Sequence, residues 1–113
     1  MNQIEQFTQD IRKSFELWKE IEIDTRSSFK ILMQFYKPDR SSSSQIVEEL
    51  SKLDYTSTVK LKRSLFIFKG TELVAIKENK WTEENLLEEL IKLNEISEKY
   101  SFQFERFMAE TNY

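Results

Sequence analysis

The apolar residues of this chain change their spacing in a fixed order, and that order limits the folds open to it. Residues 3–22 repeat with the period of a helix. From residue 28 onward the spacing follows the series strand, helix, strand, strand, helix, strand, which is typical of a split βαβ sandwich. The sequence predicts an α+β fold, a ferredoxin-like βαββαβ sandwich over residues 28–108 with an additional N-terminal amphipathic helix within residues 1–24. At 113 residues the chain, 1–113, is expected to form a single domain.

The N-terminal segment carries an apolar stripe. Its large apolar residues fall three or four positions apart, so they share one side of a helix. They are Ile4, Phe7, Ile11, Phe15, Trp18 and Ile21. The stripe either covers the core of the sandwich or pairs with another copy or a partner.

The first strand and the first helix of the sandwich follow from a change of period. Every second residue from Phe29 to Phe35 is apolar and is expected to face the core. Pro38 ends this strand because it offers no backbone donor. Ser42 and Gln45 are spaced as a capping box, which predicts the start of a short helix.

Residues 55–76 predict a long hairpin, because they are rich in β-branched and aromatic side chains. One set of alternate residues is expected to face the core: Val59, Leu61, Leu65 and Ile67. Phe66 and Phe68 have the opposite parity, and a bulge near residues 62–63 is compatible with the pattern. Gly70 is the only glycine, and we expect it where the chain reverses, since a tight turn favours positive φ.

The last helix and strand complete the series. Thr82 precedes two acidic residues, which predicts a helix start with acids in its first turn. The final strand is expected over residues 102–108. Phe104 and Met108 share the core-facing parity there, and Phe107 lies on the other side.

The strands leave apolar residues for a second sheet face as well. The expected set is Leu32, Tyr36, Phe66, Phe68 and Phe107. An apolar sheet face of this kind is uncommon on a monomer. The N-terminal helix is expected to lie across part of it, and a homodimer or a partner protein is the alternative cover.

The residue content argues against catalysis. The chain has no histidine and no cysteine, which removes Ser/His and Cys/His nucleophilic chemistry and the preferred ligands of zinc. One glycine does not make a phosphate-binding loop. The acidic pairs lie on predicted helices, where neighbouring side chains point about 100° apart and make a poor chelate. We therefore expect no enzyme activity, no cofactor and no metal.

The charge balance argues against a general nucleic-acid binder. There are 17 basic and 20 acidic residues, a net charge of −3, whereas phosphate contacts need a basic surplus. The stretch 62–68 superficially resembles the basic-aromatic strand of RNA-recognition domains but lacks its glycine, so an RNA-binding sheet is the lesser alternative. Residues 1–10 lack the pattern of a signal peptide, and no apolar run approaches a membrane span. A cytoplasmic protein without membrane contact is expected.

The C-terminal third resembles a known family. The quoted residues are Leu90-Ile91-Lys92-Leu93-Asn94-Glu95-Ile96-Ser97-Glu98-Lys99-Tyr100, then Ser101-Phe102-Gln103-Phe104-Glu105-Arg106-Phe107. They resemble the closing helix and strand of the regulator of ribonuclease E activity B family, which ends in Tyr-Asp-Gly-Trp. Phe104, Glu105 and Phe107 stand for the tyrosine, aspartate and tryptophan, and Arg106 replaces the glycine.

The resemblance implies a ferredoxin-like, non-catalytic regulator that binds a protein, as family members inhibit an RNA-degrading endonuclease by docking on its scaffold region. An immunity protein that neutralises a toxin enzyme is the alternative from another class. The partner-binding residues are expected on the last strand and the hairpin: Phe66, Phe68, Phe104, Glu105 and Phe107. Aromatic residues are the usual anchors of interfaces, although the same rings would equally pack under the first helix.

Overall fold

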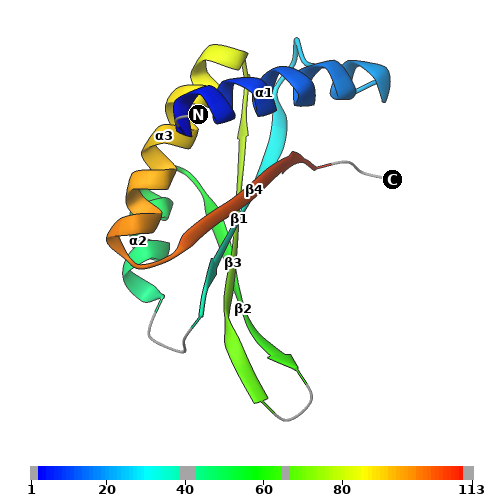
Figure 1. The fold of residues 1–113 in the computed structure, drawn as a ribbon. Helices are drawn as coiled ribbons and strands as arrows, with labels where there is room; N and C mark the ends of the chain where they lie inside the picture. Colours follow the sequence, from blue (N-terminus) through cyan, green and yellow to red (C-terminus); the bar gives the residue numbers. More distant parts are fainter. Residues whose placement is uncertain (1–2, 39–42, 65–66, 111–113) are drawn as a thin grey trace.

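The computed structural model describes residues 3–38, 43–64 and 67–110, with the backbone alone for 61–64 and 67–69. The helices are α1 (Gln3–Glu20), α2 (Ser44–Lys52) and α3 (Glu83–Lys99). The strands are β1 (Phe29–Lys37), β2 (Thr56–Ser64), β3 (Ile67–Asn79) and β4 (Gln103–Ala109). This order confirms the predicted series of one helix followed by strand, helix, strand, strand, helix, strand (Figure 1).

The strands form one antiparallel sheet in the order β2-β3-β1-β4. Helix α2 joins β1 to β2 across β3, and α3 joins β3 to β4 across β1. Strands β2 and β4 are therefore the two edges of the sheet. The hairpin of β2 and β3 extends well beyond the helices (Figure 1).

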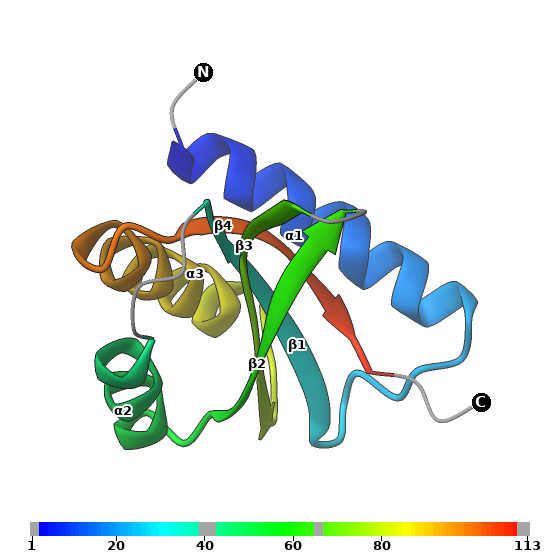
Figure 2. The same ribbon diagram turned by 90° about the horizontal axis from the view of Figure 1, so that it is seen from below.

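Helices α2 and α3 pack on one face of the sheet, which we call the helix side (Figure 2). Helix α1 lies along β4, and its buried side chains belong to the same core cluster. Phe35 of β1 is fully buried there, in one cluster with Leu50 of α2 and Leu90 of α3. The ring of Phe35 lies 5.3 Å from that of Phe104 in β4, and Phe104 lies 5.9 Å from Phe7 of α1. The expectation that the N-terminal helix crosses the second face is therefore wrong. Helix α1 covers the aromatic side chains that β4 directs to the helix side.

The core confirms the apolar stripes of the helices. Four side chains of α1 are buried, and α3 buries an apolar row along its length: Phe7, Ile11, Phe15, Trp18, Leu86, Leu90, Leu93 and Ile96. Ile31 and Met33 of β1 are inaccessible to solvent. Val59 is opposite Leu73 on the helix side but is 39% exposed, because β2 is an edge strand.

The hairpin differs from the expectation at its turn. Gly70 lies inside β3, opposite Lys62, and the pairing of β2 with β3 continues beyond it to Ser64 and Ile67, so Gly70 is not at the turn. The φ of Gly70 is +148°, and a Cβ there would meet the Lys37 carbonyl oxygen and the Tyr36 hydroxyl, the latter at 2.7 Å. Glycine is needed for close approach of two strands, not for the turn. The register shifts between Lys62 and Arg63, the position at which the sequence pattern was compatible with a bulge.

Of the two helix starts predicted from capping patterns, the structure confirms the one at Thr82. Thr82 caps α3 in a capping box with Asn85, whose side chain accepts a hydrogen bond from the Thr82 backbone N–H at 2.8 Å. The cap of α2 is Ser43, without a side-chain hydrogen bond. The cap expected at Ser42 lies outside the described residues.

A bulge in β4 makes the side chains of Phe107 and Met108 point to the sheet faces opposite to those predicted. Arg106 pairs with Gln34 and Phe104 pairs with Phe35, so Glu105 between them has no opposite residue in β1. One extra residue reverses the parity of the strand beyond it. Phe107 consequently faces the helix side, where its ring lies 6.4 Å from Trp18, and Met108 faces away. Both assignments made from strict alternation were wrong.

Candidate functional site

The five residues expected to bind a partner do not form one site. Phe66 lies outside the described residues, and Phe68 is described by its backbone only, opposite Arg63 near the end of the hairpin. Phe104, Glu105 and Phe107 lie in β4, at the opposite edge of the sheet. The structure therefore separates the hairpin from the last strand.

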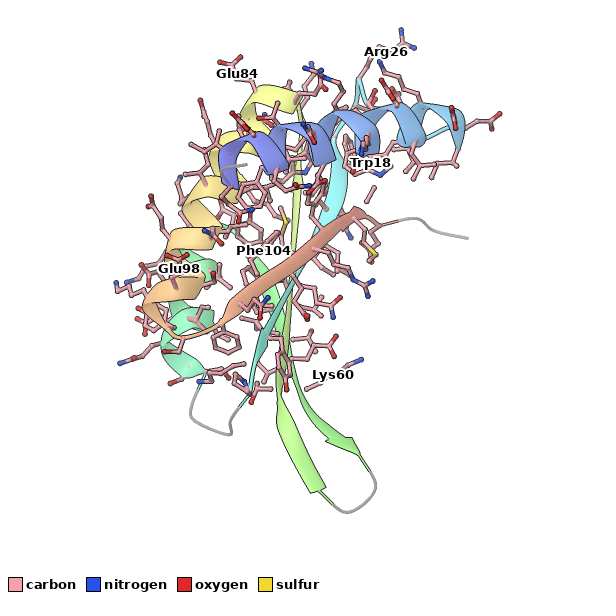
Figure 3. The ribbon with its side chains drawn as sticks, in the orientation of Figure 1. Trp18, Arg26, Lys60, Glu84, Glu98 and Phe104 are labelled. Atoms are coloured by element: carbon pink, nitrogen blue, oxygen red, sulfur yellow. The ribbon has the colours of Figure 1, made fainter. Side chains whose placement is uncertain are left out.

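The aromatic residues of β4 pack inside the molecule. Phe104 and Phe107 are half-buried and contact α1. Figure 3 shows Trp18 and Phe104 in the region between α1 and the sheet. Their principal role in the structure is to attach α1. Of Phe104, Glu105 and Phe107, the three predicted residues whose side chains are described, Glu105 is the exposed one.

A groove separates α1 from β4. Its volume is about 290 Å³, and residues 104–107 of β4 form one wall. Gln3, Gln6 and Asp10 of α1 form the other wall, with the Phe7 ring between them. We call this the β4 groove. In this groove the predicted residues Phe104, Glu105 and Phe107 lie beside residues of α1.

The sheet face opposite the helices is covered by none of the described elements, and we call it the open face. Leu32 of β1 lies opposite Ile76 of β3 on one side and Met108 of β4 on the other. Leu32 and Ile76 are half-buried, and Met108 is 38% exposed. Val74 lies beside them, opposite Gln34. These side chains form an apolar patch across three strands.

A row of polar side chains borders this patch. The Arg106 Nε donates to Gln34 Oε1 at 2.8 Å, and the Gln34 Nε2 donates to Glu72 Oε1 at 3.1 Å. The row joins β4, β1 and β3 and fixes the direction of the Arg106 guanidinium. Tyr36 lies on the same face, opposite Glu72. Of the residues expected on a second face, Leu32 and Tyr36 are confirmed there.

A closed ionic cluster lies on the helix side. Lys77 Nζ is 3.1 Å from Glu89 Oε1, which also accepts a hydrogen bond from the Tyr55 hydroxyl at 3.0 Å. Burial raises the pKa of Tyr55 far above its ordinary value, and Glu89 raises it further. Lys92 Nζ lies 3.8 Å from the other oxygen of Glu89, so this carboxylate joins two cations and the Tyr55 hydroxyl and ties α3 to β3.

A second surface groove, of about 540 Å³, lies between α2 and the end of α3. Lys99 Nζ is 3.6 Å from Glu49 Oε1. The Tyr100 hydroxyl holds the pKa of Glu49 below its ordinary value, and Lys99 assists. The groove thus contains an ionised carboxylate beside its own cation.

Within the described residues, no group of acidic side chains is arranged to hold a metal ion. None of the described helices has the length and apolar content needed to cross a bilayer. No protein-family model matches the chain, and no curated protein matches it.

Sequence reasoning placed Gln34 on the face opposite the core, which the structure confirms, and it missed the open-face residues Val74, Ile76, Arg106 and Met108. Strand parity in β3 held the signal for Val74 and Ile76, since they alternate with buried neighbours. The two residues of β4 were misassigned because nothing in the local sequence marks the bulge at Glu105.

Proposed function

We propose that this chain is a non-catalytic regulatory module that binds another protein, built as a ferredoxin-like sandwich with an additional N-terminal helix. The strand order supports the ferredoxin-like assignment. Each of the helices α2 and α3 joins two strands that are separated by a third, as a split βαβ arrangement requires.

The main support for this proposal is that the apolar patch of the open face is uncovered. Because α1 joins α2 and α3 on the helix side, no described element of this chain covers Leu32, Ile76 and Met108. An apolar centre with a polar border is the usual anatomy of a protein interface. Here the border is the hydrogen-bonded row that begins at Arg106.

The resemblance of the C-terminal third suggests the class of partner, an RNA-degrading endonuclease or its scaffold. Arg106, where the family has glycine, lies in the border of the open face and would contribute to specificity. An immunity protein that blocks a toxin enzyme is the alternative. RNA binding is less favoured, because single-stranded bases stack on several aromatic rings and Tyr36 is the aromatic residue described on the open face.

The test is capture of partners from a lysate of the host with tagged protein. One variant carries Leu32→Ser and Ile76→Ser on the open face. Its matched control carries Ile4→Ser and Val59→Ser, which removes two exposed apolar side chains elsewhere, 51% and 39% exposed. Circular dichroism and thermal unfolding confirm that each protein folds.

The proposal is supported if mass spectrometry identifies one protein that the wild type and the control capture and the open-face variant loses. An RNA-degrading endonuclease or its scaffold would support the family resemblance, and a toxin enzyme would support the immunity class. Equal capture by all three proteins, or no capture by the wild type, would contradict the proposal.

A further inference from the structure

Met108 is the accessible methionine of the described residues. It is 38% exposed, whereas Met33 is inaccessible to solvent. The other easily oxidised side chains, Trp18 and Trp81, are 4% and 1% exposed, and the sequence has no cysteine. Met1 lies outside the described residues. Within the described part of the chain, a small oxidant in solution therefore meets one sulfur atom, the thioether of Met108.

The bulge in β4 is the reason for this exposure. Glu105 has no opposite residue in β1, and this extra residue turns the Met108 side chain away from the helix side. Met108 consequently lies opposite Leu32 on the open face. With strict alternation the thioether would lie in the core, where an oxidant reaches a side chain only when the structure opens.

Met108 is also the most accessible member of the apolar patch on the open face. Leu32, Val74 and Ile76 are half-buried, and Met108 is exposed at their side. The flexible thioether is an apolar group that suits an interface. A sulfoxide at the same place is polar, and its oxygen needs a hydrogen bond when it is buried. Oxidation of this one side chain therefore makes the patch more polar and leaves the core unchanged.

We propose that Met108 is a reversible oxidation site that controls binding at the open face. Hydrogen peroxide transfers one oxygen atom to the sulfur of Met108: the O–O bond breaks and an S–O bond forms. The sulfur gives up two electrons, a proton moves to the second peroxide oxygen, and that oxygen leaves as water. The sulfoxide weakens binding because a partner would bury its oxygen without a hydrogen bond. Methionine sulfoxide reductases restore the thioether. The control of binding rests on the proposed function, and the assignment of the oxidation site does not.

The first measurement is peptide mapping by mass spectrometry after treatment with hydrogen peroxide. In the folded protein we expect Met108 to gain one oxygen at least about tenfold faster than Met33, because Met33 becomes accessible only when β1 opens. In concentrated urea the two rates should become equal, since unfolding exposes both sulfurs. Equal rates in the folded protein would overturn the assignment.

The second measurement is retention on a hydrophobic-interaction column, which reports exposed apolar surface without any partner. Oxidised wild type should elute earlier than untreated protein at an unchanged melting temperature, and sulfoxide reductases with dithiothreitol should restore the retention. Met33→Leu keeps Met108 and should respond to peroxide as the wild type does. Met108→Leu removes the sulfur and should show no shift on treatment. Met1 is common to all three proteins and is followed in the peptide map. A shift in Met108→Leu as large as that of the wild type, or no shift in the wild type, contradicts the inference.

The third measurement uses the host protein that the wild type captures and the Leu32→Ser, Ile76→Ser variant loses. The tagged chain is oxidised, freed of peroxide with catalase and then used for capture. We expect oxidation to weaken this binding about tenfold in the wild type and in Met33→Leu, and to change nothing in Met108→Leu. Unchanged capture by the oxidised wild type would refute the control of binding and leave the proposed function in place. If untreated wild type captures no such protein, the proposed function and the control of binding fail together, while the first two measurements still decide the oxidation site.

Discussion

Truncation of Trp18 tests whether α1 is part of the core. Trp18 is 4% exposed and lies 4.9 Å from the ring of Phe15 and 5.5 Å from that of Phe29. A buried tryptophan removes roughly 150–250 Å² from water, which corresponds to about 4–6 kcal/mol at about 25 cal/mol per Å². Alanine retains part of this burial, so Trp18→Ala should reduce the free energy of unfolding by about 3–5 kcal/mol.

The assay is urea unfolding followed by circular dichroism at equilibrium, with a thermal scan alongside. For a domain of this length the melting temperature should fall by about 12–20 °C. Leu17→Ala is the control, because Leu17 precedes Trp18 in the same helix and is 53% exposed. It should change stability by less than about 0.5 kcal/mol. If Trp18→Ala costs no more than Leu17→Ala, α1 does not pack on the sheet, and the assignment of α1 to the core cluster is refuted.

Three further predictions concern the sheet and the ionic cluster. Gly70→Ala should cost about 1–3 kcal/mol in urea unfolding, because its Cβ would meet the Lys37 carbonyl at a positive φ; an unchanged midpoint would contradict the close approach. Glu89→Leu should cost about 3 kcal/mol by leaving Lys77 and the Tyr55 hydroxyl without their partner, whereas Lys77→Met with Glu89→Leu should cost less, because only the Tyr55 hydroxyl then loses a partner; equal losses would refute the pairing. The pKa of Tyr55 is raised in the folded state, so the unfolded chain loses this proton first and stability falls as the pH rises above 10.0. Tyr55→Phe should flatten that alkaline limb, measured as unfolding free energy against pH, and an unchanged slope would contradict the shift.

The order of the elements could be read from the sequence because period two and period 3.6 are distinct over long segments. The placement of α1 could not. An amphipathic stripe states that one side of a helix is buried, and it does not state which sheet face buries it. Gly70 was misplaced because a turn and a close approach of strands both favour glycine. Only the pairing of β3 with β1 separates these two explanations.

Both candidate surfaces depend on one residue, Glu105, which the local sequence does not mark as a bulge. Without the bulge at Glu105, strict alternation would direct Met108 to the core and Phe107 to the open face. The bulge sends Phe107 to Trp18 instead, which anchors α1 on the helix side. It also places Met108 in the apolar patch and leaves Glu105 at the rim of the β4 groove. Because bulges typically occur at sheet edges and redirect side chains there, one extra residue in an edge strand both completes the core and defines the two surfaces that remain for a partner.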